Sequence, residues 1–295
     1  MYNKIMEANH KRESNIKVAI FLNVLFTIIE LIGGIWTNSL TIMSDALHDF
    51  GDSVTLTTAW IAEKTAQKKP DTRRTFGYQR ISLFSALLSA IVLVTGSLFI
   101  LSRAVPRLMN PEHVNVTGMA LLAIIGITFN GIAVLRLKKG QDLNERVLTW
   151  HMLEDVLGWC VILTGSIIMF FWDNHLIDPI MTVGFTLFIL WGVVKNLKET
   201  INIFLQGVPS HININHIRDS LLSYEGIKRI HDVHVWSLEG ETDVFTGHIV
   251  VDDSLLKSPD ETRRIIKNEL NKHHIEHSTI ELESEGFCSG IECND

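Results

Sequence analysis

Two histidine–aspartate pairs lie within long apolar stretches of this 295-residue chain. His48 precedes Asp52 by four residues, and His151 precedes Asp155 by the same spacing. Residues four apart share one face of an α-helix, so each pair can present an imidazole and a carboxylate to the same neighbour. Ionisable groups in such stretches cost about 2.5 to 3.5 kcal/mol each on membrane-insertion scales. A chain that keeps two matched pairs there is expected to use them, and the pairs predict the two halves of one metal site.

The four side chains favour a particular chemistry. Two imidazole nitrogens and two carboxylate oxygens from facing helices form a closed tetrahedral shell that suits Zn²⁺, whereas monovalent copper prefers Cys or Met. Two ionised aspartates cancel the charge of a divalent ion, and a site without metal must take up protons to avoid adjacent like charges. Metal and protons therefore compete for the same atoms, which predicts an exchange of metal for protons. One such pair arises easily by chance in a chain with 13 His, but two pairs in apolar stretches favour the metal site.

Other polar residues lie close to these pairs. Asp45 precedes His48 by about one helical turn and is a candidate further ligand, although we favour a role in orienting the ligands or solvating the helix end. Asp49 and Glu154 point about 100° away from their neighbours in a helix, so they are left out of the predicted shell. Glu30 lies in an earlier apolar stretch, where a hydrogen bond between helices is its expected role.

Six stretches are long enough to cross a hydrocarbon core of about 30 Å as helices. We expect them at residues 16–37, 41–64, 78–102, 115–136, 145–172 and 177–203. The second and fifth stretches are the least hydrophobic because they carry the two pairs. An even number of spans places both termini on one side of the membrane.

Lysine and arginine decide the orientation. Sixteen of them precede the first span, lie in the second and fourth connections or end the sixth span, whereas only Arg103 and Arg107 fall on the other side. Both termini are therefore expected in the cytoplasm. The first seventeen residues are polar and the apolar run after them continues into a span, so no cleavable signal peptide is expected.

The composition changes near Pro209. Residues 1–208 carry 18 Lys/Arg and 16 Asp/Glu, whereas residues 209–295 carry 8 and 17. An acidic segment of this kind repels nucleic acid and attracts cations. The change predicts a membrane domain over residues 1–208 and a cytoplasmic domain over residues 209–295.

The cytoplasmic segment has alternating patterns typical of a small α+β sandwich. The expected order of helix, strand, strand, helix, strand occupies residues 213–223, 227–238, 244–251, 259–273 and 278–283. The three cysteines give no disulfide framework. Cys288 and Cys293 could hand metal to the domain, although a free tail is the more frequent arrangement.

Several runs of the sequence resemble the cation diffusion facilitator family. They are residues 30–52, 75–80, 151–155 and 178–179. In that family, paired residues of the second and fifth spans bind the transported ion. The resemblance therefore implies a transport site made of His48, Asp52, His151 and Asp155. A histidine at the first of these positions resembles the zinc-preferring members and weakens a manganese or iron interpretation.

The resemblance implies further properties of the chain. Members are typically homodimers of subunits with six transmembrane helices and a C-terminal cytoplasmic α+β domain of ferredoxin-like fold. That domain carries metal sites, and the matching positions are His231, His248, His277 and Glu283. Zn²⁺ is the expected transported ion and a candidate regulatory ion, and no organic cofactor is expected. The connection over residues 137–144 has no His, so metal capture by that loop is not expected.

These observations favour a secondary active transporter that exports Zn²⁺, with Cd²⁺, Co²⁺ or Ni²⁺ as other candidate cargo, in exchange for protons. The alternative is a membrane metal sensor or receptor without net flux. A hydrolase is disfavoured because the sequence lacks H-E-x-x-H and because four protein ligands leave no position for water. The sequence also lacks the phosphate-binding loop of an ATP-driven pump. The expected location is a bacterial inner membrane, and the expected partners are divalent ions, protons, lipid and a second copy, with no nucleic acid.

Overall fold

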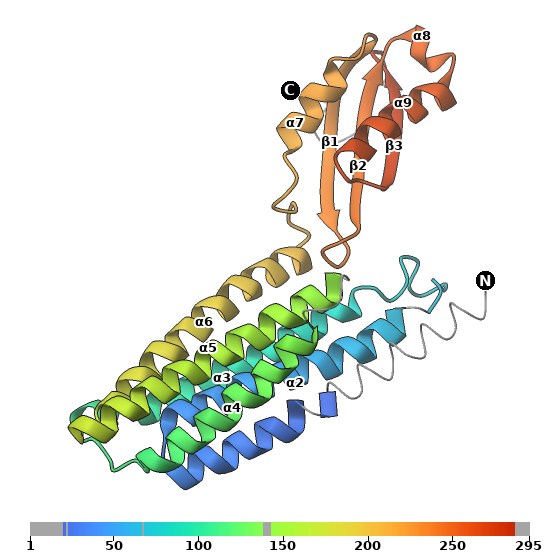
Figure 1. Cartoon of the computed structure of the whole chain (residues 1–295). Helices are drawn as coiled ribbons and strands as arrows, with labels where there is room; N and C mark the ends of the chain where they lie inside the picture. The colour runs from blue at the N-terminus through green and yellow to red at the C-terminus, as the bar shows by residue number, and fades with distance from the viewer. Residues whose placement is uncertain (1–19, 22, 67, 138–142, 287–295) are drawn as a thin grey trace, which may run out of the picture. The chain divides into compact units, whose positions relative to one another are not determined.

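A computed structural model describes residues 20–21, 23–66, 68–137 and 143–286 of the chain (Figure 1). The side chains of some helical residues, including His151, lie outside that description. Cys288 and Cys293 also lie outside it, so their role stays a prediction. The described residues form two compact units, one from the ranges 1–61 and 85–196 and one from the ranges 62–84 and 197–295. The domain boundary expected between residues 208 and 209 likewise stays a prediction.

Long helices build the first unit, and they follow the predicted apolar stretches. A first helix, described over Asn23–Thr37, precedes the labelled helices α2 (Leu40–Ala66), α3 (Ile81–Met109), α4 (Val116–Leu137), α5 (Leu143–Trp172) and α6 (Ile177–Phe204). Among the described residues, three helices are long and apolar enough to cross a membrane, at Ile81–Met109, Met152–Trp172 and Ile177–Phe204. The shorter apolar helices are Asn23–Thr37 and Val116–Ile132. Helix α2 is in neither group, as expected from the polar residues that it carries.

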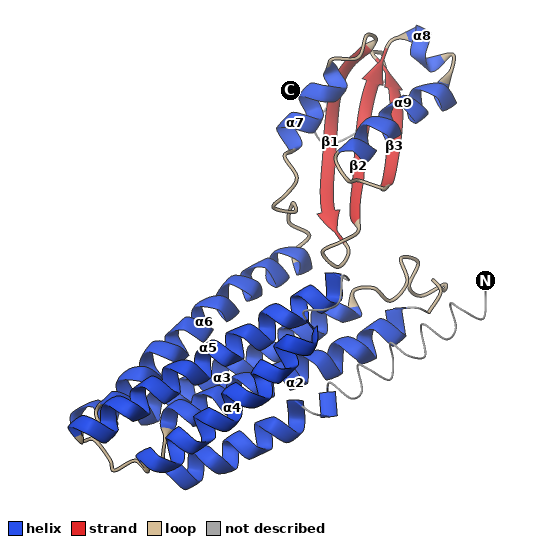
Figure 2. Ribbon diagram, viewed as in Figure 1, coloured by secondary structure: helices blue, strands red, loops and turns tan. Residues whose placement is uncertain are grey.

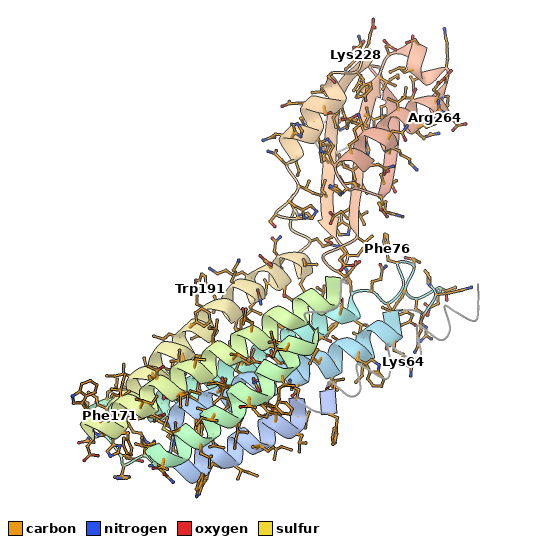
Figure 3. The ribbon with its side chains drawn as sticks, in the orientation of Figure 1. Lys64, Phe76, Phe171, Trp191, Lys228 and Arg264 are labelled. Carbon is orange, nitrogen blue, oxygen red and sulfur yellow. The ribbon has the colours of Figure 1, made fainter. Side chains whose placement is uncertain are left out.

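The outward surfaces of these helices are strongly apolar. Phe171 and Trp191 are 75% and 69% exposed, and both side chains project away from the helices (Figure 3). Leu98 on α3 and Phe188 on α6 are exposed in the same way. Soluble monomers rarely expose contiguous apolar surface on this scale, so the surface is suited to contact with lipid.

Buried polar contacts hold the start of α2 against α6. The Asp178 carboxylate accepts hydrogen bonds from the Ser39 hydroxyl at 2.6 Å and from the backbone N–H of Leu40 at 3.0 Å. The first N–H groups of a helix have no partner within the helix, so a carboxylate there caps it. The hydroxyl of Thr41, the next residue of α2, lies 2.9 Å from that of Thr182, one turn after Asp178 on α6. Helix α6 therefore fixes the position of α2, which carries the first His/Asp pair.

The second unit contains a three-stranded sheet with helices packed on it (Figure 2). Its elements are α7 (Ile214–Leu222), β1 (Ile227–Ser237), β2 (Asp243–Val251), the short α8 (Asp253–Leu256), α9 (Pro259–Lys272) and β3 (His277–Ser284). The strands lie in the order β1-β2-β3, with β1 and β2 antiparallel and β2 and β3 parallel. The predicted α+β order is confirmed, and α8 is an addition to it.

One apolar core joins α7 and α9 to the sheet. Leu221 of α7, Leu270 of α9 and Ile249 of β2 are fully buried in it. Full burial of such a side chain contributes about 1.5 to 3 kcal/mol. A polar contact adds to the packing, since the Ser220 hydroxyl of α7 donates to the Glu269 carboxylate of α9 at 2.5 Å. These contacts hold the strands in place. The histidines lie at other positions of the same strands.

Candidate metal-binding sites

His48 and Asp52 lie on the same side of α2. The His48 Nε2 and Asp52 Oδ2 atoms are 3.8 Å apart, and the side chains are 26% and 23% exposed. This distance exceeds that of a hydrogen bond, so the two groups are close without being locked to each other. The His48 ring meets the Phe185 ring of α6 edge to face, with centroids 6.5 Å apart. Helix α2 therefore presents an imidazole and a carboxylate that can turn toward a shared ion.

Asp155 lies on α5 in a buried position, at 9% exposed. One turn later, α5 comes close to α2, because a Cβ atom on Gly158 would lie 3.6 Å from the Oδ1 atom of Asp45. Electrostatic interactions link Asp155 to Asp45 and to Asp49 on α2. Gly158 of α5 and Asp45 of α2 are therefore near neighbours where the two pair-bearing helices meet.

The full set of four transport residues stays a prediction. His48, Asp52 and Asp155 have described side chains, and they lie on helices that come close to each other. His151 belongs to α5, but its side chain lies outside the described residues.

The structure adds three buried acidic residues that the sequence placed outside the shell. Glu30, Asp45 and Asp49 are 1%, 4% and 4% exposed, which is deeper than His48. The carboxyl groups of Glu30 and Asp49 lie close enough to interact through charge. Buried carboxyl groups are costly unless they are paired, protonated or bound to a cation, so these residues increase the attraction for positive charge beside the pair. The four-residue spacing between Asp45 and Asp49 is the sequence signal that could have indicated these two aspartates.

A second group of metal-type ligands lies in the sheet of the other unit. His231 of β1, His248 of β2 and Glu283 of β3 each offer one ligand atom, and these atoms all lie within 4.8 Å of one another. The Glu283 carboxylate bridges the two rings, at 3.0 Å from His231 Nε2 and 2.8 Å from His248 Nδ1. His231 and His248 are direct partners across β1 and β2, which places both rings on one face of the sheet. We name these three residues the sheet cluster, and imidazole and carboxylate ligands of this kind suit Zn²⁺.

His277 lies apart from the sheet cluster. It is the first residue of β3 and is exposed, whereas Glu283 lies near the far end of the strand. At about 3.3 Å per residue, their six-residue separation corresponds to roughly 20 Å. The structure therefore brings three of the four predicted cytoplasmic residues together, and a role for His277 stays a prediction.

Two further carboxylates face His248. Its Nε2 atom lies 3.6 Å from Asp232 Oδ2 and 3.5 Å from Glu281 Oε2. Burial penalises the charged form of this imidazole, but the Glu283 hydrogen bond and the three negative charges outweigh burial and raise the pKa of His248. The surroundings of the sheet cluster therefore favour positive charge.

The position of Asp232 was not predictable from strand alternation. Its φ angle is 51°, and the pairing register of β1 shifts between His231 and His234. Such a β-bulge redirects side chains, so Asp232, which follows His231 in the chain, also reaches His248. The sequence gives no bulge signal here, since the position is not a glycine.

The comparisons with known families cover both units. Residues 16–205 match the family model described as cation efflux transmembrane domain, and residues 209–285 match the one described as cation efflux protein, cytoplasmic domain. The chain belongs to the cation diffusion facilitator family.

Relatives within the cation diffusion facilitator family align over almost the whole chain. A cadmium, cobalt and zinc/H(+)-K(+) antiporter of Bacillus subtilis is 35% identical over 95% of this chain and 93% of its own length. The metal cation efflux system protein CzcD of Cupriavidus metallidurans is 32% identical, with 92% and 86% covered. The zinc transporter ZitB of Yersinia pestis is 33% identical, with 97% and 91% covered. The chain is therefore a multi-pass membrane protein for metal cation efflux. Its family is one of transporters and not of enzymes.

Proposed function

We propose that this protein exports Zn²⁺ from the cytoplasm in exchange for protons. The proposed transport site consists of His48 and Asp52 of α2 with His151 and Asp155 of α5. The observation that carries the proposal is the close approach of these helices at Gly158, which sets the buried Asp155 beside the acidic groups of α2. The names of the relatives, which include a zinc/proton antiporter and zinc transporters, support the choice of ions.

The charge of the site explains why metal and protons would exchange. Two ionised aspartates neutralise one Zn²⁺. When the site is empty, the carboxylates repel each other in the low-dielectric interior, and uptake of protons removes this repulsion. Glu30, Asp45 and Asp49 add negative charge beside it. Release of the metal on one side is therefore linked to proton uptake, and loading on the other side to proton loss.

The proposal includes an orientation and an assembly. The excess of Lys and Arg on one side places both termini and the sheet-containing domain in the cytoplasm. The relatives are bacterial, which supports a bacterial inner membrane. We expect a homodimer, and sedimentation of the detergent-solubilised protein measures it.

A resident Zn²⁺ is proposed for the sheet cluster. His231, His248 and Glu283 would hold it, and the ion would replace the direct contacts of Glu283 with the two imidazoles. Bound metal would stabilise the folded domain because the ligand atoms come from three different strands.

The sheet cluster also favours the second candidate function, a metal sensor without net flux. Its three ligand atoms lie within 4.8 Å of one another, as a site that holds metal without moving it requires. A sensor would bind metal in the cytoplasmic domain and would move none across the membrane.

One experiment separates the two functions. Purified protein is reconstituted in sealed vesicles that contain a zinc-sensitive dye, and a pH gradient is imposed. We expect flux in the parent protein and its loss in Asp52→Ala and Asp155→Ala. The matched control is Glu154→Ala, which removes the exposed carboxylate next to Asp155 in the chain and should retain flux.

The outcomes are distinct. Flux that persists in both aspartate variants would contradict the transport site. A parent protein that binds zinc but gives no flux would support the sensor.

A further inference from the structure

Two arginines at the end of α3 line one cavity. The cavity has a volume of about 430 Å³ and lies between the start of α2 and the last turns of α3. Arg103 and Arg107 form part of its wall, and Leu40, Phe99 and Ile100 form an apolar part. Arg103 and Arg107 are the only Lys or Arg residues of the membrane domain that the charge distribution places opposite the cytoplasm. Their meeting in one cavity is not explained by metal transport.

Arg107 is already paired. Its Nη1 atom donates to the Asn38 backbone oxygen at 2.9 Å, and its Nη2 atom donates to the Asn38 side-chain oxygen at 2.7 Å. A salt bridge with Glu112 neutralises its charge. The Arg107 side chain is 15% exposed, so Arg107 mainly fixes the turn before α2.

The positive charge of Arg103 is not neutralised by Glu112. It lies one turn before Arg107 on the same helix face, and its guanidinium sits 5.5 Å from the centroid of the Phe99 ring. Among the described residues, no carboxylate forms a salt bridge with it. With Glu112 opposite Arg107, the charged groups lining the cavity sum to +1.

We propose that this cavity binds the phosphodiester headgroup of an anionic phospholipid. The planar guanidinium of Arg103 offers paired N–H donors that match two phosphate oxygens, and one phosphodiester charge balances the cavity. Phe99 is 53% exposed and Leu98 is 57% exposed, so an acyl chain can continue along the apolar face of α3. Basic pockets between transmembrane helices bind lipid headgroups on the cytoplasmic or matrix side of membranes, and the same attraction between charges would act on a headgroup of the opposite leaflet. A metal ion would not enter a cavity with net positive charge.

Lipid binding to the full-length protein tests the proposal. Native mass spectrometry counts the lipids retained by detergent-solubilised protein that is titrated with phosphatidylglycerol or with zwitterionic phosphatidylcholine. We expect one tightly retained phosphatidylglycerol per chain, and a loss of about five- to tenfold in its affinity in Arg103→Gln. Arg103→Lys keeps the positive charge without the paired N–H donors of the guanidinium and should give an intermediate loss of affinity.

The control is Lys195→Gln, which removes an exposed charge of α6 and should leave lipid retention unchanged. Thermal unfolding in phosphatidylcholine reports whether the Arg103 variants remain folded. Equal retention by parent and Arg103→Gln, or equal affinity for the two lipids, would overturn the proposal. Displacement of the lipid by millimolar inorganic phosphate would instead assign a free-anion site, and a change of oligomeric state without lipid loss would assign a contact with a second copy.

Discussion

The α2 pair and the sheet cluster contain the same ligand types, but the side chains differ in their distances and in their exposure. In the sheet cluster, a buried carboxylate contacts two imidazoles at 2.8 and 3.0 Å, and all three side chains come from hydrogen-bonded strands. On α2, the imidazole and the carboxylate lie 3.8 Å apart and are about a quarter exposed. A preassembled shell suits an ion that stays, whereas the proposed transport shell, which would take its other half from a second helix, would suit an ion that must leave.

The backbone explains the difference. Strand partners are fixed by the ladder of a sheet, so His231 and His248 cannot separate without breaking it. The two halves of the proposed transport site belong to α2 and α5, which have no shared backbone hydrogen bonds. Helices can shift against each other by small amounts, and this freedom would let protons replace the metal.

The largest expected effect concerns flux. Asp155→Asn should reduce zinc flux by more than the roughly 10- to 100-fold typical of residues that only orient a ligand. Glu283→Gln should retain flux at saturating zinc because the sheet cluster is not on the proposed path. Vesicle assays on both variants check this, and a comparable loss in the two would remove the distinction between the sites.

The second prediction concerns metal affinity in the sheet cluster. Glu283→Gln should weaken the tighter class of zinc binding by about 100-fold, because the amide lacks the negative charge and one of the two oxygens that contact the imidazoles. Calorimetric titration of the full-length protein measures it, with His277→Ala as the comparison variant. His277 lies far along β3, so its removal should change the affinity much less. A similar loss in both variants would show that His277 reaches the ion by another route.

The third prediction concerns selectivity at α2. His48→Asp exchanges a directed nitrogen for a more adaptable oxygen donor, which should favour the larger Cd²⁺. We expect the Zn²⁺/Cd²⁺ flux ratio to fall by about tenfold, equivalent to roughly 1.4 kcal/mol. Flux measured with each metal tests this. An unchanged ratio would count against His48 as the selecting group.

The smallest expected effect concerns Glu269 of α9, whose partners Ser220, Tyr224 and Lys272 lie outside the sheet cluster. Hydrogen bonds from Lys272, Ser220 and Tyr224 lower the pKa of Glu269 from 4.5 to about 2. A lowered carboxyl pKa stabilises the folded state above about pH 4.5, and this contribution is lost as the pH falls toward 2. Glu269→Gln should therefore cost about 1 kcal/mol at neutral pH and nothing near pH 2.

Hydrogen exchange of the buried sheet amides in the full-length protein measures this loss. The loss should be the same with and without zinc, in contrast to that of Glu283→Gln. A zinc-dependent effect of Glu269→Gln would show that the two carboxylates are coupled.

The pattern of the sequence predicted most of the fold. Asn213 was expected to begin a helix, and its side chain accepts a hydrogen bond from the backbone N–H of His216 as the N-cap of α7. Helix α9 begins at Pro259, where a proline at the first turn was expected. Local features of this kind are readable because capping and periodicity depend on neighbouring residues only.

The sequence by itself determined which residues could serve as ligands, since the His/Asp spacing on a helix and the alternation in a strand follow from fixed periods. Only the tertiary structure decided that Glu283 joins His231 and His248 while His277 lies apart. It also decided that a bulge brings Asp232 to His248, and that Asp49, predicted to point away from the shell, is buried within range of the Asp155 charge. These outcomes depend on strand register and helix packing, which are set by contacts between residues far apart in the chain and therefore leave no local pattern.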